Sequence, residues 1–210
     1  LGKLGADWIG DHIVNDLGAE GVDCSRVLRD PTLCSPFNVA AYTDRHRIGG
    51  FLLPNSLDAL ETSDVADMTD DLQPDDWVVV EVGEIELGIV EAFCQMVRNR
   101  GAGIVVDVDL DPIKQCVGPR GAIDDILGAA KLIVPNVSAM ATMYPGINAR
   151  DLAHRMTEDY EVTTVVTAGE RGAFWCEVGE LVREQESPDV DVVDTVGAGD
   201  AFHGGLLHAL

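Results

Sequence analysis

The chain has 210 residues, 46% of them hydrophobic, and a formal net charge of −23 from 37 acidic and 14 basic residues. This length and composition predict a single folded domain over residues 1–210 and argue against a disordered or repetitive chain. The acidic balance argues against nucleic-acid binding, because neutralising phosphates needs a basic face. Charges interrupt every apolar stretch, so we expect no membrane-spanning segment and an acidic, solvated surface.

The five cysteines are widely spaced, and none forms a Cys-x-x-Cys pair. This pattern predicts neither a zinc site nor a disulfide framework. It favours a reducing compartment, and we therefore expect a cytoplasmic protein.

The first predicted elements are a helix and a hairpin. Residues 7–17 carry apolar side chains on one helical face, and glycines follow them. Residues 33–53 contain two apolar stretches around the polar turn 43–46, which predicts an antiparallel hairpin. The acidic segment 64–76 is a connector or a weakly amphipathic helix.

Beyond this point, short β-branched stretches alternate with helical segments. The predicted strands are residues 77–80, 104–106, 132–134 and 164–166. The predicted helices are residues 87–100, 122–130, 138–143 and 150–160. Each strand is apolar on both faces, as buried parallel strands are. The alternation predicts an α/β fold with a doubly wound, mostly parallel sheet. A second hairpin is expected around Gly179, with strands at 173–176 and 180–183.

Polar side chains follow the carboxyl ends of the predicted strands, where ligands bind in open α/β sheets. They are Glu81, Glu84, Asp107, Asp109, Asn136 and the segment Thr167-Ala168-Gly169. Any one of them alone reads as an ordinary loop residue. Together they are expected to line one crevice with the Asp200 segment described next.

The most informative motif is Asp194-Thr-Val-Gly-Ala-Gly-Asp200, which an apolar helical stretch follows. Its Gly-Ala-Gly turn can aim several N–H groups at one point, and the positive end of a helix dipole faces the same point. The carboxylate of Asp200 lies beside this predicted anion site. A general base next to an anion site is the combination that phosphoryl transfer to a hydroxyl needs.

This motif resembles the C-terminal signature of the ribokinase-like (PfkB) carbohydrate kinases at all six fixed positions. The resemblance implies the ribokinase-like fold, with the hairpin at residues 33–53 as a β-lid over the sugar. It further implies that Asp200 is the catalytic base, in contact with the substrate. The backbone amides of Gly197, Ala198 and Gly199 would form the anion hole.

Other segments extend the resemblance to nearly the whole chain. Thr167, Gly169 and Gly172 match the family's Thr-x-Gly-x-x-Gly nucleotide-binding segment, and Asn136 matches the Asn of its Asn-x-x-Glu motif. Glu81 lies where some members place a carboxylate near the sugar. Asp194 matches the first Asp of the signature, which in some members helps bind potassium.

The resemblance implies ATP and Mg²⁺ as cofactors, with K⁺ in some members. It also implies a small-molecule sugar substrate and a homodimer formed through the lid. Compared with the family, the chain is expected to be a fragment that lacks the first strand with its substrate motif and the C-terminal adenine-contacting segment. Ala139 replaces the Glu of Asn-x-x-Glu, which puts the handling of magnesium in question.

The favoured function is therefore ATP-dependent phosphoryl transfer to a sugar hydroxyl. Two alternatives stay open: a non-catalytic sugar- or nucleotide-binding regulator of the same fold, which Ala139 would suit, and a nucleoside kinase. A nicotinamide-dependent oxidoreductase is disfavoured because no Gly-x-Gly-x-x-Gly follows an early strand. A P-loop kinase is disfavoured because the chain contains neither Gly-Lys-Ser nor Gly-Lys-Thr.

Overall fold

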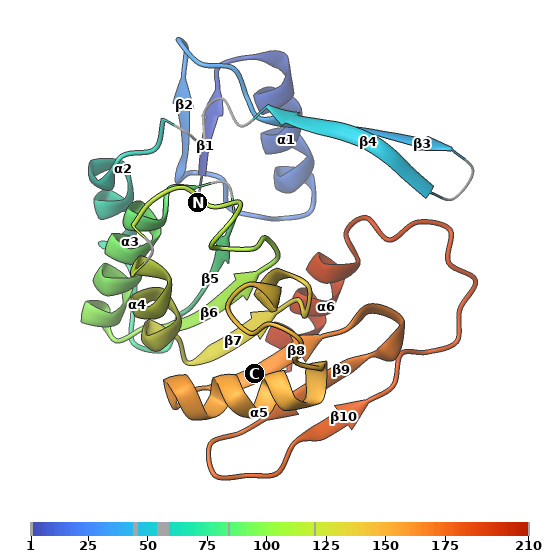
Figure 1. Ribbon diagram of the computed structural model, residues 1–210. Coiled ribbons are helices and arrows are strands. Elements are labelled where there is room, and N and C mark those ends of the chain that lie inside the picture. Colours follow the sequence, from blue (N-terminus) through green and yellow to red (C-terminus); the bar gives the residue numbers. More distant parts are fainter. Residues whose placement is uncertain (1, 44–45, 54–58, 84, 120, 210) are drawn as a thin grey trace.

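The computed structural model describes residues 2–43, 46–53, 59–83, 85–119 and 121–209. In this part of the chain, six strands form a sheet in the order β10-β9-β8-β7-β6-β5 (Figure 1). Their bounds are β5 Trp77–Val82, β6 Gly103–Val108, β7 Leu132–Pro135, β8 Thr163–Thr167, β9 Ala173–Cys176 and β10 Arg183–Gln185. Strands β5 to β8 are parallel, and β9 and β10 join in antiparallel pairs. The predicted mostly parallel α/β sheet is confirmed.

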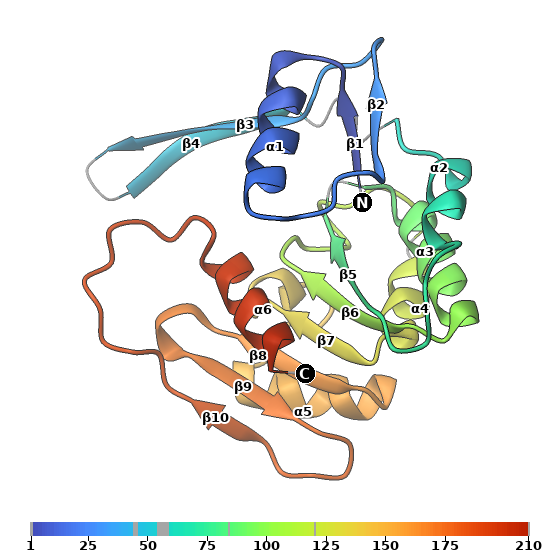
Figure 2. The same cartoon turned by 180° about the vertical axis from the view of Figure 1, so that it is seen from behind.

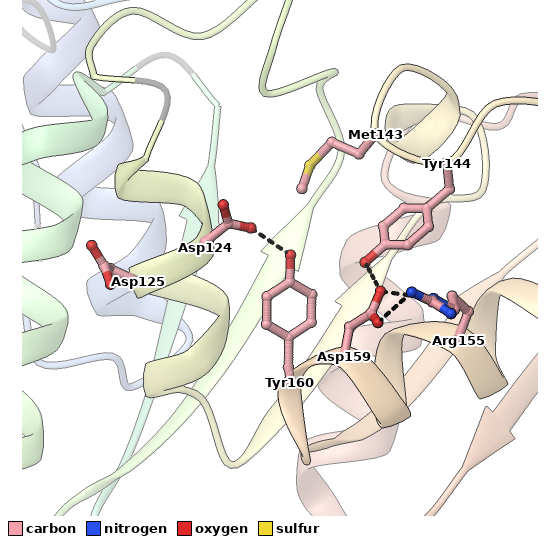
Figure 3. A pocket seen from close by; sticks show the side chains of 7 residues that line it. All are labelled: Asp124, Asp125, Met143, Tyr144, Arg155, Asp159 and Tyr160. Atoms are coloured by element: carbon pink, nitrogen blue, oxygen red, sulfur yellow. Dashed lines mark hydrogen bonds and ion pairs between the residues drawn. The ribbon is translucent and has the colours of Figure 1, made fainter.

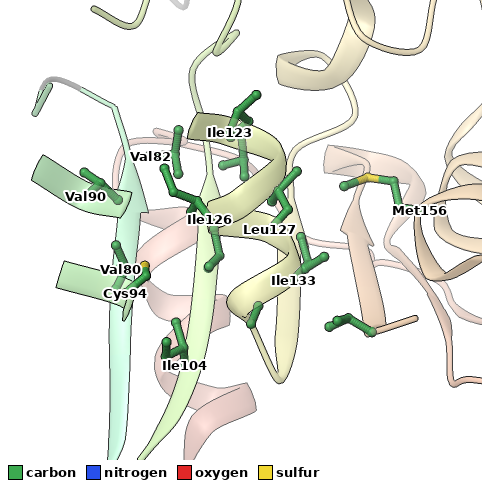
Figure 4. Close-up of a cluster of buried hydrophobic side chains, with 14 of the residues drawn as sticks. Val80, Val82, Val90, Cys94, Ile104, Ile123, Ile126, Leu127, Ile133 and Met156 are labelled. Carbon is green, nitrogen blue, oxygen red and sulfur yellow. The ribbon is translucent and has the colours of Figure 1, made fainter. Parts of the chain in front are cut away.

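Three helices cover one face of this sheet, and a fourth lies on the other (Figures 1 and 2). The covering helices are α3 Leu87–Arg100, α4 Ala122–Ala129 and α5 Ala149–Tyr160, which match the predicted ranges to within one residue. Figure 4 shows the core beneath them, where Val80, Ile104 and Ile133 of the strands meet Ile126 and Leu127 of α4. This face is almost purely apolar.

Helix α6, Ala198–His208, packs on the opposite face. Its Phe202, Leu206 and Leu207 lie against a smaller apolar cluster that includes Val105 and Val134. The helix therefore fixes the end of the signature motif against the middle strands of the sheet.

The expectation that every parallel strand is buried on both faces is wrong for β5. Val78, Val80 and Val82 are buried, but Trp77 and Val79 on the other face are each 45% exposed. The apolar cluster under α6 draws its members from β6 to β9 and does not reach β5. In an edge strand with one covered face, buried and exposed side chains alternate, and the uniformly apolar residue types of β5 did not reveal this.

The N-terminal segment adds two short strands that the sequence did not predict. Strand β1 (Gly2–Gly5) pairs in parallel with β2 (Val27–Asp30), and α1 (Trp8–Ala19) connects them. The predicted helix at residues 7–17 is confirmed, with its end two residues later. Asp7 caps it by accepting a hydrogen bond from the Gly10 N–H at 2.8 Å.

The hairpin predicted at residues 33–53 is confirmed as β3 (Phe37–Thr43) and β4 (His46–Leu53), which pair antiparallel. It extends away from the sheet in both views (Figures 1 and 2). The middle of its turn, residues 44–45, lies outside the described residues. Just before β3, the backbone N–H and the Oγ of Ser35 each donate to the Asp7 carboxylate at 2.7 Å. The base of the hairpin is thereby tied to the start of α1.

The remaining predictions are confirmed with shifted ends. The acidic segment contains a short helix α2 (Thr62–Ala66) and a 3₁₀ turn η1 (Asp67–Thr69). The helix expected at 138–143 is a 3₁₀ turn, η2 (Ala139–Ala141), and a third such turn, η3 (Gly169–Arg171), follows β8. In the second hairpin, β10 begins at Arg183, because residues 177–182 form a wider turn than the sequence suggested.

Candidate active site

The start of α6 carries the backbone geometry that the signature motif predicts. Gly197 precedes the helix with φ +77°, a left-handed conformation that disfavours any residue with a Cβ. The first helical hydrogen bond runs from the Ala201 N–H to the Gly197 carbonyl at 2.9 Å. Gly199 and Asp200 lie in the first turn, where N–H groups have no acceptor within the helix. This helix start is a site where an anion is favoured.

One of the three expected anion-hole amides has a protein partner. The Ala198 N–H donates to the Thr195 carbonyl at 3.2 Å, which closes the turn before the helix. To bind an anion, this N–H would exchange that bond for one to the ligand. The amides of Gly197 and Gly199 flank it on either side.

Asp200 is exposed, and it is the third residue of α6. A Cβ built on Gly197 would lie 3.9 Å from its Oδ2, so the carboxylate is close to the glycine turn. The helix dipole stabilises a negative charge at this position. The base and the anion site predicted from the sequence are thus adjacent.

Strand β6 and the segment just after it bring two further carboxylates to α6. The Oδ2 of Asp109 lies 3.7 Å from the position of a Cβ on Gly199. Asp107, which is buried, contacts His203 of α6, with 3.1 Å between Oδ2 and Nδ1. The hydrogen bond to Asp107 raises the pKa of His203 above its ordinary value, with smaller contributions from the Asp107, Asp109 and Asp200 charges against the effect of burial.

Asn136 and Thr167 lie side by side, as their places at the ends of β7 and β8 predict. The two residues form a parallel bridge, and the Val137 N–H donates to the Thr167 carbonyl at 3.1 Å. The Asn136 N–H donates to the Val108 carbonyl at 3.0 Å, which joins this pair to the end of β6. Its side-chain oxygen accepts from the backbone N–H and the hydroxyl of Ser138. The ends of three neighbouring strands therefore form one continuous edge.

The turn after β8 requires both of the glycines that the sequence singled out. Gly169 and Gly172 have φ of +58° and +86°. The Gly172 N–H donates to the Gly169 carbonyl at 2.9 Å, and a Cβ on Gly172 would lie 2.0 Å from the Gln185 carbonyl oxygen. At Gly172 the missing side chain makes room for the backbone of residues 185–187, whereas a Cβ on Gly169 would meet nothing within 4 Å.

Three other predicted positions lie at the margin of this arrangement. Glu81, at the end of β5, is paired in register with Asp107 and is exposed, and the neighbouring Glu84 lies outside the described residues. Asp194 lies on the exposed segment before α6, where its Oδ1 accepts from the Val196 N–H at 3.0 Å. Ala139 is only 3% exposed and belongs to the apolar core, so this position offers no oxygen to a metal.

A separate hollow of about 690 Å³ lies between α4 and α5, on the other face of the sheet (Figure 3). In it, the Tyr160 hydroxyl donates to Asp124 and the Tyr144 hydroxyl donates to Asp159, which also pairs with Arg155. None of the site residues predicted from the sequence lines it. Sequence reasoning also did not assign His203 to the site. The available signal was its spacing of three residues from Asp200, which places both on one side of α6.

A sheet edge with an anion-binding helix start and a neighbouring carboxylate suits a phosphoryl-transfer enzyme of the α/β class. Residues 1–210 match the pfkB family carbohydrate kinase, and the chain belongs to this family. Curated relatives include the ribokinase of Lactococcus lactis, 23% identical over the whole chain and 65% of its own length, and the deoxyribokinase of Salmonella typhi, 26% identical over 99% of the chain and 67% of its own. The 1-phosphofructokinase of Escherichia coli is 41% identical over 61 residues, which are 29% of the chain and 19% of that protein.

Solved structures show the same fold. The fructokinase of Vibrio cholerae with fructose, ADP and calcium bound has a TM-score of 0.78 at 22% identity, over 99% of this chain and 68% of its own. The nucleoside kinase of Burkholderia thailandensis in complex with inosine has a TM-score of 0.73 at 19% identity, over 99% of this chain and 64% of its own. The chain thus spans about two thirds of the length of this ribokinase, deoxyribokinase, fructokinase and nucleoside kinase.

Among the described residues, no helix combines the length and the apolar character that crossing a bilayer requires.

Proposed function

We propose that this protein is an ATP-dependent kinase that transfers the γ-phosphoryl group to a hydroxyl of a sugar or sugar-like substrate. The observation that carries the proposal is the adjacency of Asp200 to the Gly197 turn at the start of α6. A base and an anion-binding helix start, held next to each other, supply the two things that the transfer needs. Membership of the pfkB family supports the same reaction class.

In this mechanism Asp200 accepts the proton of the substrate hydroxyl while the hydroxyl oxygen forms a bond to the γ-phosphorus. The bond from the γ-phosphorus to the bridging oxygen breaks, and ADP leaves. The N–H groups of Gly197, Ala198 and Gly199 stabilise the charge on the transferred group, and each such donor contributes about 3–4 kcal/mol in related sites. Ala198 does so by releasing its bond to Thr195.

The nucleotide would lie along the edge formed by Asn136 and Thr167 and against the turn from Gly169 to Gly172. The backbone at Gly169 is open to phosphates or ribose, because no side chain is present and nothing lies within 4 Å of a Cβ position there. The edge is continuous with the end of β6 through the Asn136–Val108 hydrogen bond. The γ-phosphate would thereby point toward the start of α6.

Magnesium fits this site if most of its ligands come from the nucleotide. The described residues contain no group of three or more His, Cys, Asp or Glu side chains that could hold a metal ion. Mg²⁺ in kinase sites is commonly held by one or two carboxylates, phosphate oxygens and water. When bound, the ion neutralises charge on the phosphates. Binding of K⁺ near Asp194, dimerisation through the β3–β4 hairpin acting as a lid, and a cytoplasmic location remain parts of the proposal.

The substrate class favoured here is a sugar, with Glu81 as a candidate contact. The ribokinase, deoxyribokinase and fructokinase among the relatives act on or bind sugars, as their names state. A nucleoside remains the second candidate because the kinase in complex with inosine shares the fold. A non-catalytic binding protein would bind nucleotide or sugar without turnover, and Ala139 is the residue that favours this alternative.

The test is Asp200→Asn in the intact protein, assayed by ATP consumption against a panel of sugars and nucleosides. Loss of a general base typically costs about 10²–10⁴-fold in rate. We expect kcat to fall by that factor while ATP binding, measured by calorimetry, stays within about twofold of wild type.

Asp191→Asn is the matched control, because Asp191 is an exposed carboxylate on the same segment before α6. It should leave kcat unchanged. Near-normal turnover by Asp200→Asn would remove Asp200 as the base. A folded wild-type protein that binds ATP but phosphorylates no member of the panel would favour the binding-protein alternative.

A further inference from the structure

The contact between His203 and Asp107 is the one polar link that is described between the apolar side of α6 and the sheet. It joins the end of β6 to the second turn of α6, with 3.1 Å between Asp107 Oδ2 and His203 Nδ1. Each side chain is only 10% exposed. The other residues of α6 that pack on the sheet are Phe202, Leu206 and Leu207, which are apolar.

The two kinds of contact constrain α6 differently. Apolar packing is non-directional, so it holds the helix on the sheet while tolerating small shifts along or about the helix axis. A charge-assisted hydrogen bond needs a short distance and a favourable angle, so it fixes rotation and register. Because His203 follows Asp200 by three residues, fixing His203 also fixes the turn that carries Asp200.

The charges around His203 are all negative in the described structure. Asp107 faces it from β6, Asp109 from the segment just after that strand, and Asp200 from its own helix. Glu81 of β5 is the register partner of Asp107. The side chains from β7, β8 and β9 that pack under α6 are apolar. His203 therefore lies among the carboxylates at the edge of the sheet where the proposed phosphoryl group would also bind.

We propose that His203 is a positioning residue, which through Asp107 holds the first turn of α6 and thereby aims Asp200 at the acceptor hydroxyl. This inference rests on the proposed kinase function and deepens it. A displacement of about 1 Å in a catalytic group can lower a rate by roughly 10²-fold. The contact thus matters for rate beyond any contribution to stability.

A stabilising role and a positioning role predict different results. A buried ion pair often adds little net stability, because the cost of desolvation offsets the attraction. Here Asp107 Oδ1 and His203 Nε2 also have no hydrogen-bond partner among the described protein groups. Replacing both partners together should therefore affect the rate more than the melting temperature, whereas removing His203 alone leaves the Asp107 charge buried and should lower both.

The kinetic test compares His203→Ala with the double variant Asp107→Asn/His203→Gln, which restores a neutral hydrogen bond at the same place. We expect His203→Ala to lower kcat by roughly 10–100-fold, with the KM for ATP and for sugar within about threefold of wild type. The double variant should recover at least part of the lost kcat. If His203→Ala folds poorly, the kcat of the double variant can still be compared with that of wild type. His208→Ala, an exposed histidine of the same helix, should match wild type.

Combination with Asp200→Asn shows whether His203 acts through Asp200. Groups that act as one unit are not additive, so His203→Ala should not slow Asp200→Asn any further. An equal loss in both backgrounds would overturn the proposal. So would a fall in melting temperature with kcat per folded molecule unchanged.

Backbone hydrogen exchange tests the positioning without any turnover. In His203→Ala, amides of residues 198–202 should exchange faster while those of β7 and β8 keep their wild-type rates. If the exchange rates change equally throughout the protein, or do not change at all, His203 does not specifically hold the start of α6. If wild type phosphorylates nothing, the proposed function fails by that result alone, and this exchange measurement alone decides whether His203 holds the start of α6.

Discussion

The two faces of the sheet carry different parts of this protein. The face under α3, α4 and α5 is closed and apolar, with residues such as Leu127 and Ile133 fully buried. The face under α6 is only partly covered: it carries Asp107, which contacts His203 of α6, and at the other end of the strands it leaves Trp77 45% exposed. Stability is concentrated on the first face, and the chemistry proposed for the protein on the second.

The difference follows from what each face must do. Close packing needs apolar side chains on both partners and leaves little room for charge. A site for phosphoryl transfer needs carboxylates and free N–H groups near the surface. Since a packed apolar core and a charged site cannot occupy the same interface, they lie on opposite faces of the sheet. Substitutions on the two faces should therefore have separable effects.

The largest expected effect comes from Leu127 on the closed face. Leu127→Ala should destabilise the protein by about 2–5 kcal/mol, because it leaves a cavity in a packed core. The matched variant is Leu207→Ala on α6, where the side chain is only half-buried and the cost should be less than half as large. Urea unfolding measures both. Equal costs would mean that the α6 face is as tightly packed as the other.

A second pair of substitutions lies within α6 and its cap. Gly197→Ala forces a Cβ onto a residue with φ +77° and should shift the turn proposed to bind the anion. We expect kcat to fall by about 10²-fold, as when one oxyanion donor is lost. Gly204→Ala, in the middle of the same helix with open space around it, should leave kcat unchanged and slightly raise the melting temperature. Similar kinetics for the two variants would argue against an anion role for the turn.

Strand β5 allows the two faces to be compared at neighbouring valines. Val80 is buried under α3, whereas Val79 is 45% exposed on the α6 side. Val80→Ala should cost about 2 kcal/mol and Val79→Ala less than about 1 kcal/mol, by the buried methyl groups each loses. The difference in unfolding free energy between the two variants is the measurement. A Val79→Ala cost as large as that of Val80→Ala would show that this face is covered in solution.

The smallest effect concerns Asp7, which lies on neither face. Hydrogen bonds from the Gly10 and Ser35 backbone N–H groups, then from the Ser35 hydroxyl, lower the pKa of Asp7 from 3.8 to about 2. Its contribution to stability is present above pH 3.8 and is lost as the pH falls toward 2. Asp7→Asn should thus lower the melting temperature at pH 6, and the difference from wild type should shrink between pH 4 and 2. A pH-independent difference would contradict this assignment.

Helix and strand positions in the sheet were predictable because their signals are local. The β-branched stretch at 104–106 and the amphipathic segment at 87–100 appear in the structure as β6 and α3. Strands β1 and β2 were missed because each has only four residues and no clear alternation. The exposure of Trp77 was missed because residue type does not tell which strand forms the edge of a sheet.

The candidate site was predictable in part for the same reason. The Gly197–Asp200 motif carries its own turn and helix start, and both are present. Asn136 and Thr167 were expected to be neighbours from the rule for strand ends, and they form a bridge. His203 was not assigned to the site, since its partner Asp107 is distant in sequence and only the packing of α6 on the sheet brings them together.

The sequence by itself determined the α/β class, the glycine turn and the carboxylate beside it, because these depend on residue type and short-range spacing. Only the tertiary structure decided which face of the sheet α6 covers, and therefore which residues meet Asp200 and Gly199. That choice rests on contacts between segments far apart in the chain, such as His203 with Asp107. Such pairings are fixed by packing of the whole sheet, which no local pattern encodes.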